Sequence, residues 1–185
     1  MSGRMLLHDR RLEGNPPSIA DNTYQVDANT STTHMVDWVG TYARGRGGLD
    51  ELIIMCHGYY DHLSFSGLQL GDSNLTITNG VLTTAWHPSI RKIYLYSCGA
   101  GDEGFMGPAE SGRRFCSDLA GWTGANVYAA DALQWYRLER SLMQRIFGTN
   151  QAGTINFRSW EGQVYRFSPD GTITAVTLAA QPTSR

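Results

Sequence analysis

Two apolar runs that stop abruptly at glycine-containing segments constrain the fold of this chain more than any other feature. The first covers residues 49–56 and ends at His57 and Gly58 in "LDELIIMCHG". The second covers residues 93–96 and ends in "SCGAG". Short apolar runs bounded by turn residues are typical of strands in a parallel sheet that is covered on both faces. We therefore predict two buried core strands.

Helix and strand patterns alternate around these two runs. Helical spacing predicts four helices, over residues 34–45, 80–86, 107–124 and 137–148, and Thr32 or Thr33 is expected to cap the first. Strand and turn signals predict a hairpin-like excursion, a third buried strand and a C-terminal β-hairpin, over residues 63–80, 125–131 and 154–178. This order predicts an α/β fold with a mostly parallel central sheet, flanked by helices on both faces, and the hairpin at its end.

The first 30 residues are polar and contain Asn15-Pro16-Pro17. They are expected to form an irregular N-terminal arm (residues 1–30), with a short strand near Tyr24 to Val26. A length of 185 residues suits one core better than two, so residues 1–185 are predicted to form a single domain.

Composition narrows the classes of partner and compartment. Lysine and arginine number 15 against 17 acidic residues, so a nucleic-acid partner is not expected. No apolar run approaches the roughly 20 residues of a membrane span, and the short patch at Met5–Leu7 does not make a signal-peptide core. Three cysteines without CxxC spacing suggest neither a disulfide framework nor a cysteine zinc site. The expected location is the cytoplasm, although secretion without a cleaved signal would leave no trace in the sequence.

The carboxyl ends of the three predicted core strands carry His57, Cys98 and Asp131. Reactive groups gather beyond this edge of an open α/β sheet. A histidine and a cysteine in neighbouring strands can act together, because the imidazole accepts the thiol proton and the thiolate attacks a carbonyl. The backbone N–H groups of Gly58 and Cys98 are the expected oxyanion donors. No cofactor or metal is needed, and no ligand spacing for a metal is present.

Ordinary structural roles compete with this interpretation. A cysteine after an apolar strand is most often a small buried residue, and a His-Gly pair is most often part of a turn. Cys56 and Cys116 fit that description. His62 stays in reserve because it lies close to His57 in the sequence. A third catalytic residue is not identifiable, but a backbone carbonyl could orient the imidazole.

The runs "LIIMCHG" and "KIYLYSCGAG" resemble the caspase-haemoglobinase fold of the clan CD cysteine peptidases, and the bacterial CHAT, separase and gingipain-like members are the most similar. The likeness covers about residues 49–136. It implies that His57 is the general base, that Cys98 is the nucleophile and that Gly58 supplies an oxyanion donor. Tyr96 and Ser97 precede Cys98 in place of the caspase Gln-Ala, so cleavage after aspartate is not implied.

The resemblance also implies a substrate. The expected function is a cysteine endopeptidase that cleaves a protein or peptide, often one dedicated partner protein. "NVYAADALQW" resembles the specificity segment of the family, which would place Asp131 at the floor of the pocket to bind a basic residue and Trp135 at a neighbouring subsite. Asp131 could equally cap the following turn, and Trp135 could belong to the core. The alternative function is a catalytically silent module of the same fold that binds peptides.

Overall fold

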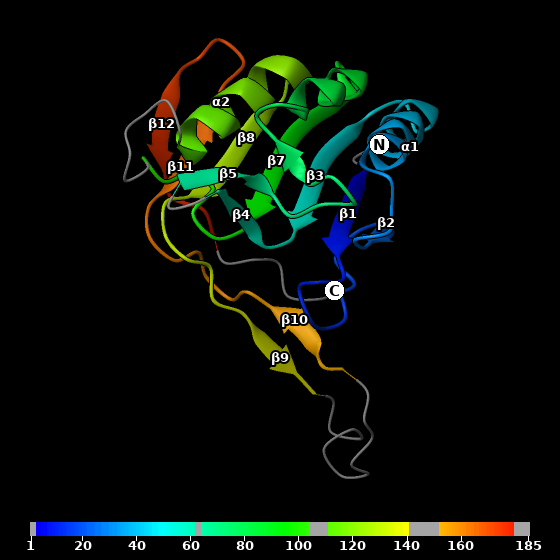
Figure 1. Cartoon of the computed structure of the whole chain (residues 1–185), viewed down its shortest axis with the longest axis vertical. Coiled ribbons are helices and arrows are strands. Elements are labelled where there is room, and N and C mark those ends of the chain that lie inside the picture. Colours follow the sequence, from blue (N-terminus) through cyan, green and yellow to red (C-terminus); the bar gives the residue numbers. More distant parts are fainter. Residues whose placement is uncertain (1–2, 62–63, 104–110, 141–151, 180–185) are drawn as a thin grey trace.

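The computed structural model describes residues 3–61, 64–103, 111–140 and 152–179 (Figure 1). Its main sheet has seven strands in the order β12-β11-β8-β7-β3-β1-β2. Their bounds are β1 Arg4–Asp9, β2 Asn22–Val26, β3 Leu49–Met55, β7 Ile90–Tyr96, β8 Asn126–Ala130, β11 Val164–Phe167 and β12 Ile173–Val176. Two small sheets accompany it, one of β4 Gly58–Asp61, β5 Ser64–Leu68 and β6 Leu75–Thr76, and the other of β9 Arg137–Glu139 and β10 Thr154–Asn156.

The main sheet is mixed. Neighbours from β2 to β8 run parallel, whereas β11 is antiparallel to β8 and to β12. Two α-helices, α1 (Thr32–Gly45) and α2 (Gly112–Thr123), and a 3-10 helix, η1 (Gly80–Trp86), connect the strands in the described part of the chain. The prediction of an α/β fold is therefore confirmed in its general form.

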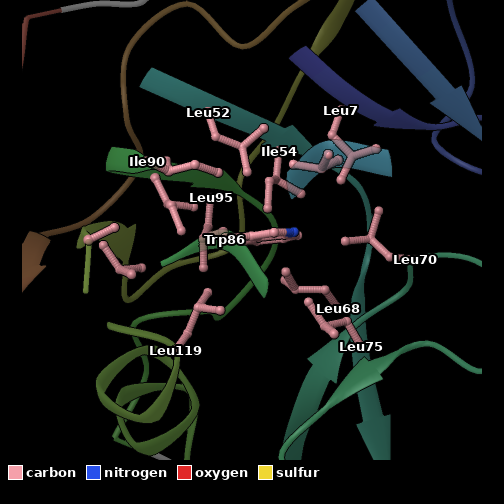
Figure 2. Close-up of a cluster of buried hydrophobic side chains, with 14 of the residues drawn as sticks. Leu7, Leu52, Ile54, Leu68, Leu70, Leu75, Trp86, Ile90, Leu95 and Leu119 are labelled. Atoms are coloured by element: carbon pink, nitrogen blue, oxygen red, sulfur yellow. The ribbon is translucent and has the colours of Figure 1, made fainter. Parts of the chain in front are cut away.

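Both α-helices and η1 contribute to one core on one face of the sheet. Alternate residues of β3 and β7 point into it, and α1 adds Met35 and Val39 while α2 adds Phe115 and Leu119. Figure 2 shows the indole of Trp86 surrounded by aliphatic side chains from the sheet, from α2 and from the β5–β6 segment. The Trp86 Nε1–H donates to the Val36 carbonyl at 2.9 Å, so the only polar atom of this indole is satisfied.

The opposite face is covered differently. Its core combines Leu6, Ile53, Met55 and Tyr96 from the main sheet with residues of three other segments. These are Leu12 and Ile19 between β1 and β2, the partly buried Tyr136 before β9, and Ile155 and Phe157 in and after β10. No described helix contributes to this cluster. The prediction that helices flank both faces is therefore not confirmed. For brevity, the two sides are called the helix-covered face and the segment-covered face.

The N-terminal arm is more regular than predicted. Residues 4–9 form β1, which lies between β2 and β3 in the interior of the sheet. Met5 and Leu7 enter the core of the helix-covered face, and Leu6 enters the other core. The prediction of an irregular arm over residues 1–30 is thus wrong for residues 4–9, because a run of only three apolar residues suffices where both faces are buried. The short strand expected near Tyr24 to Val26 is confirmed as β2.

Three further predictions need adjustment. Residues 137–139 of the expected helix 137–148 form β9, and most of its remainder lies outside the described residues. The C-terminal hairpin consists of β11 and β12, whereas residues 154–156 pair with β9 (Figure 1). The cap of α1 is Ser31, not Thr32 or Thr33, since the Ser31 side chain accepts from the His34 N–H.

Candidate active site

The register of two neighbouring strands brings His57 and Cys98 together. β3 and β7 are adjacent and parallel, and Met55 pairs with Tyr96 at their ends. The Cys56 N–H still donates to the Tyr96 carbonyl at 3.3 Å. Continued by two residues, this register would bring His57 opposite Cys98, and both residues line the same pocket. Side chains alternate between faces along a strand, so both point to the segment-covered face, as Met55 and Tyr96 do.

Glycines allow the two strand ends to turn so close to each other. A side chain at Gly58 would overlap the carbonyl oxygen of Cys98. Gly99 has φ +68°, and a side chain there would overlap the Tyr60 hydroxyl. The same hydroxyl donates to the Cys98 carbonyl at 3.1 Å. Burial, and secondarily the nearby Cys98, raises the pKa of Tyr60 to about 12, so the hydroxyl stays protonated and remains a donor near neutral pH.

A backbone carbonyl orients the imidazole of His57. The Nε2 atom lies 3.2 Å from the carbonyl oxygen of Arg11, in the segment that follows β1. A carbonyl only accepts hydrogen bonds, so a neutral His57 must carry its proton on Nε2 to form this bond. Its Nδ1 is then the basic atom. This is the arrangement that a histidine without a carboxylate partner needs in order to act as a base.

A buried ion pair fixes the segment that carries this carbonyl. The carboxylate of Asp9 is fully buried and accepts from the Arg11 guanidinium at 2.8 and 2.7 Å, a bidentate arrangement. It also accepts from the backbone N–H groups of Arg11 and Gly71. Hydrogen bonding to Asp9 raises the pKa of Arg11. The position of the Arg11 carbonyl is therefore determined by contacts on both sides of it.

His57 and Cys98 line one pocket of about 320 Å³. Its other lining residues come from the three segments that cover this face and from the strand ends: Leu12, Cys56, Tyr96, Ser97, Leu133, Gln134, Trp135, Tyr136 and Phe157. The Cys98 sulfur lies 3.9 Å from the Gln134 carbonyl oxygen. A pocket that combines a thiol and an imidazole with an apolar wall is suited to hold a ligand beside the sulfur.

The three cysteines differ in their surroundings. All three are free thiols, and Cys98 alone is partly exposed. Burial raises the pKa of the Cys56 thiol and that of the Cys116 thiol, so both stay protonated. Cys116 also donates to the Ala100 carbonyl at 2.9 Å. The structure thus supports a packing role for Cys56 and Cys116 and leaves Cys98 as the accessible sulfur.

Backbone N–H groups are available near the sulfur. The N–H of Cys98 has no acceptor among the residues that the structure describes, whereas that of Gly99 donates to the Ala132 carbonyl at 3.3 Å. The Gly58 backbone passes directly against Cys98. The Cys98 N–H is therefore available to donate a hydrogen bond to an oxyanion that forms at a carbonyl beside the sulfur.

The two predicted substrate-binding residues lie in different places. Trp135 lines the pocket and is 72% exposed. Asp131 is not among the lining residues. Its Oδ1 accepts from the Gln163 N–H at 2.9 Å, and its own N–H donates to the Gln163 carbonyl, so it joins the end of β8 to the start of β11. Asp131 therefore neither lines the pocket nor caps the following turn, and a preference for basic residues lacks its expected carboxylate.

Sequence reasoning missed several residues around the pair. Arg11 and Asp9 were unrecognised because the apolar run before them is short, although "MLLHDRR" does place both residues at a strand end. Tyr60 gives no sequence signal of its role. The role of Gln134 beside the Cys98 sulfur was also missed. Its central position in the segment between β8 and β9 is the one sequence feature that could have indicated it. His62 lies outside the described residues.

Within the described ranges, no cluster of three or more His, Cys, Asp or Glu side chains could hold a metal ion. Among the same residues, no helix is both long and apolar enough to cross a membrane. Comparisons with protein-family models, curated proteins and solved structures found no match. A function for this protein must therefore be inferred from the chemistry of the site itself.

Proposed function

We propose that this protein is a cysteine peptidase of the caspase-like type, in which His57 and Cys98 form a catalytic dyad. The observation that carries the proposal is the pocket shared by a partly exposed thiol and an imidazole whose Nε2 is bound to a backbone carbonyl. This combination supplies a nucleophile, a base and an orienting group, which are the three parts that covalent acyl transfer needs.

The reaction follows from these groups. Nδ1 of His57 accepts the Cys98 proton, and the sulfur attacks the carbonyl carbon of the scissile peptide bond. The tetrahedral oxyanion is stabilised by the N–H of Cys98, with Gly58 as the second expected donor. The imidazolium then gives its proton to the departing amine, which leaves a thioester. Water, activated by the same imidazole, attacks the thioester carbon and releases the acid and the thiol.

The substrate is a protein or peptide, and one dedicated partner protein is the form of substrate that the family likeness suggests. The chemistry needs no cofactor, and three free thiols suit a reducing compartment such as the cytoplasm. A silent peptide-binding module of the same fold is the competing proposal, and it differs from the peptidase only in the reactivity of Cys98.

Alkylation kinetics test the proposal. Native protein is treated with a limiting amount of iodoacetamide, and the modified cysteine is mapped by mass spectrometry. We expect modification of Cys98 alone, with a rate that falls in His57→Ala, because the imidazole takes up the proton that the thiol loses as it attacks. Cleavage of a peptide library should require reducing agent and should persist in EDTA.

Two controls make the result decisive. Cys116→Ala should behave like the wild type, and Cys98→Ala should be neither alkylated nor active. If Cys98 reacts no faster than a free cysteine and His57→Ala leaves its rate unchanged, the dyad is not formed and the peptidase proposal fails. Loss of cleavage in EDTA with recovery on addition of zinc would point instead to a metal-dependent enzyme.

A further inference from the structure

The wall of the pocket beside Cys98 is apolar. Six of its lining side chains are large and hydrophobic or aromatic: Leu12, Tyr96, Leu133, Trp135, Tyr136 and Phe157. Apart from the dyad itself, no carboxylate, ammonium or guanidinium lines it within the described parts of the chain. The acid that was expected there, Asp131, is engaged by the Gln163 backbone.

The wall is held in a defined shape. Gln134 is 5% exposed, and its amide donates to the carbonyls of Ala132 and Glu161 at 3.0 and 2.9 Å while its Oε1 accepts from the Glu161 N–H. These bonds tie the segment over the sulfur to the segment after Phe157. A wall fixed in this way binds its ligand without a large ordering cost.

Aromatic contacts fix the base of the pocket. The Tyr96 ring stacks on Trp160, with ring centroids 4.2 Å apart, and also packs on Phe157 at 5.1 Å. Phe157 in turn contacts Tyr136 at 5.6 Å. The rings supply apolar surface of fixed geometry next to the point of attack.

The rim of the pocket leaves apolar surface uncovered. Leu133 is 55% exposed and Trp135 is 72% exposed, and both line the pocket within three residues of each other. Adjacent large apolar side chains that stay exposed beside a concave site are a common mark of ligand contact. The two side chains stand on the segment that also carries the Gln134 carbonyl, 3.9 Å from the sulfur.

We infer that this pocket selects a large apolar side chain on the residue whose carbonyl Cys98 attacks. The inference rests on the proposed peptidase function and replaces the basic preference that the sequence suggested. A leucine or phenylalanine side chain would be desolvated against Leu133, Trp135 and Phe157, and each such burial is favourable. An arginine or aspartate there would lose hydration without gaining a counter-ion, which is costly.

Affinity labels that differ at one residue test the inference. Four peptidyl acyloxymethyl ketones carry leucine, phenylalanine, arginine or aspartate next to the reactive group. In each, the Cys98 sulfur displaces the carboxylate leaving group, and a thioether forms. The rate is followed by intact mass, and the site is confirmed by digestion. We expect the leucine and phenylalanine labels to react at least about tenfold faster than the other two, the range that a hydrophobic pocket provides.

Two variants at exposed leucines sharpen the test. Leu133→Asp places a carboxylate in the pocket wall, so the arginine label should gain and the leucine label should lose, each by about tenfold. Leu82→Asp is the matched control, since Leu82 is 36% exposed in η1 and does not line the pocket. Its label preferences should equal those of the wild type.

The outcomes separate the two proposals. If Cys98 is labelled in a His57-dependent way but arginine or aspartate labels react as fast as leucine, the inference about the pocket is wrong and the peptidase proposal stands. If Leu133→Asp changes no preference, the apolar rim does not contact this residue of the substrate, and the inference is again wrong. If no label reacts with Cys98, the peptidase proposal fails, and the inference fails with it.

Discussion

The two faces of the main sheet differ in what covers them and in what they leave open. The helix-covered face is packed by regular elements, and its largest side chains, such as Trp86 and Phe115, are fully buried. The segment-covered face is closed by short segments from three parts of the chain, and a pocket of about 320 Å³ remains between them. Packed helices cover a sheet face without gaps, whereas short segments can leave a pocket between them.

Alternate residues of the same strands serve these two purposes. In β3 and the residues after it, Leu52 and Ile54 face the helices, while Met55 and His57 face the pocket side. A substitution should therefore affect stability or activity according to the face on which it lies. Four predictions use this difference between the faces. Each compares a substitution on one face with a control substitution of the same residue type at another place in the molecule.

The largest effect is expected for the cysteines of the two faces. Cys98→Ala should lower turnover of a peptide substrate by at least about a thousandfold, because the nucleophile is lost, and should change the free energy of unfolding by less than about 0.5 kcal/mol. Cys116→Ala should keep activity and lose about 1 kcal/mol of stability. Kinetics and urea denaturation of both variants check this. Comparable activity of the two variants would contradict the division.

The next effect concerns tryptophan. Trp86→Ala removes a fully buried indole from the helix-covered face, and we expect a loss of about 3–5 kcal/mol in the free energy of unfolding. Trp135→Ala removes an exposed indole and should cost less than about 0.5 kcal/mol. Denaturation followed by circular dichroism measures both. A loss of more than about 2 kcal/mol for Trp135→Ala would show that the pocket wall is part of the structural core.

Asp9 should influence catalysis only by holding the Arg11 carbonyl, and through it His57, in position. In Asp9→Asn, the bidentate contact with Arg11 is weakened, so the Arg11 carbonyl holds His57 less firmly. We expect kcat to fall about tenfold with little change in KM, since a positioning defect acts on the transition state. Asp50→Asn, which breaks the exposed pair with Arg91, is the control. Equal effects of the two variants would leave Asp9 a structural residue only.

The smallest effect is a pH dependence from His8. Burial lowers the pKa of His8, against the opposing effects of its bond to the Leu12 carbonyl and of Asp9. Because the unfolded state then binds the proton more tightly, folded-state stability is highest above the ordinary pKa of 6.5 and falls as pH drops through and below it. His8→Gln should remove this part of the dependence, at most about 1.4 kcal/mol per pH unit. His34→Gln, at an exposed position, should retain it in urea titrations between pH 8 and 5.

The sequence predicted the parts of the fold whose signal is local. The strands that end before His57 and near Cys98, the helices around residues 34–45 and 112–123, and the C-terminal hairpin all have clear periodicity. β1 was missed because His8 and Asp9 look like loop residues, and their burial is possible only through the Leu12 carbonyl and the Arg11 fork. These partners lie only four and two residues away, but apolar periodicity does not reveal such polar contacts.

The candidate site shows the same limit. Placing His57 beside Cys98 needed only strand ends and adjacency, both of which follow from an α/β order. Asp131 was harder, because a carboxylate after a strand can face a pocket or a neighbouring backbone, and the choice depends on where Gln163 arrives from residues far away in the chain. The contact of Arg11 with His57 spans 46 residues and has no local signature.

The register between β3 and β7 has a consequence for how this molecule can change. His57 and Cys98 are placed by interior strands, while the pocket wall comes from segments far apart in the chain, near Leu12, Trp135 and Phe157. Substitutions, natural or from a directed library, can change each segment separately without moving the His57 imidazole or the Cys98 sulfur. If the proposed peptidase function holds, these three short stretches of sequence are a practical target for changing which peptide bond is cut.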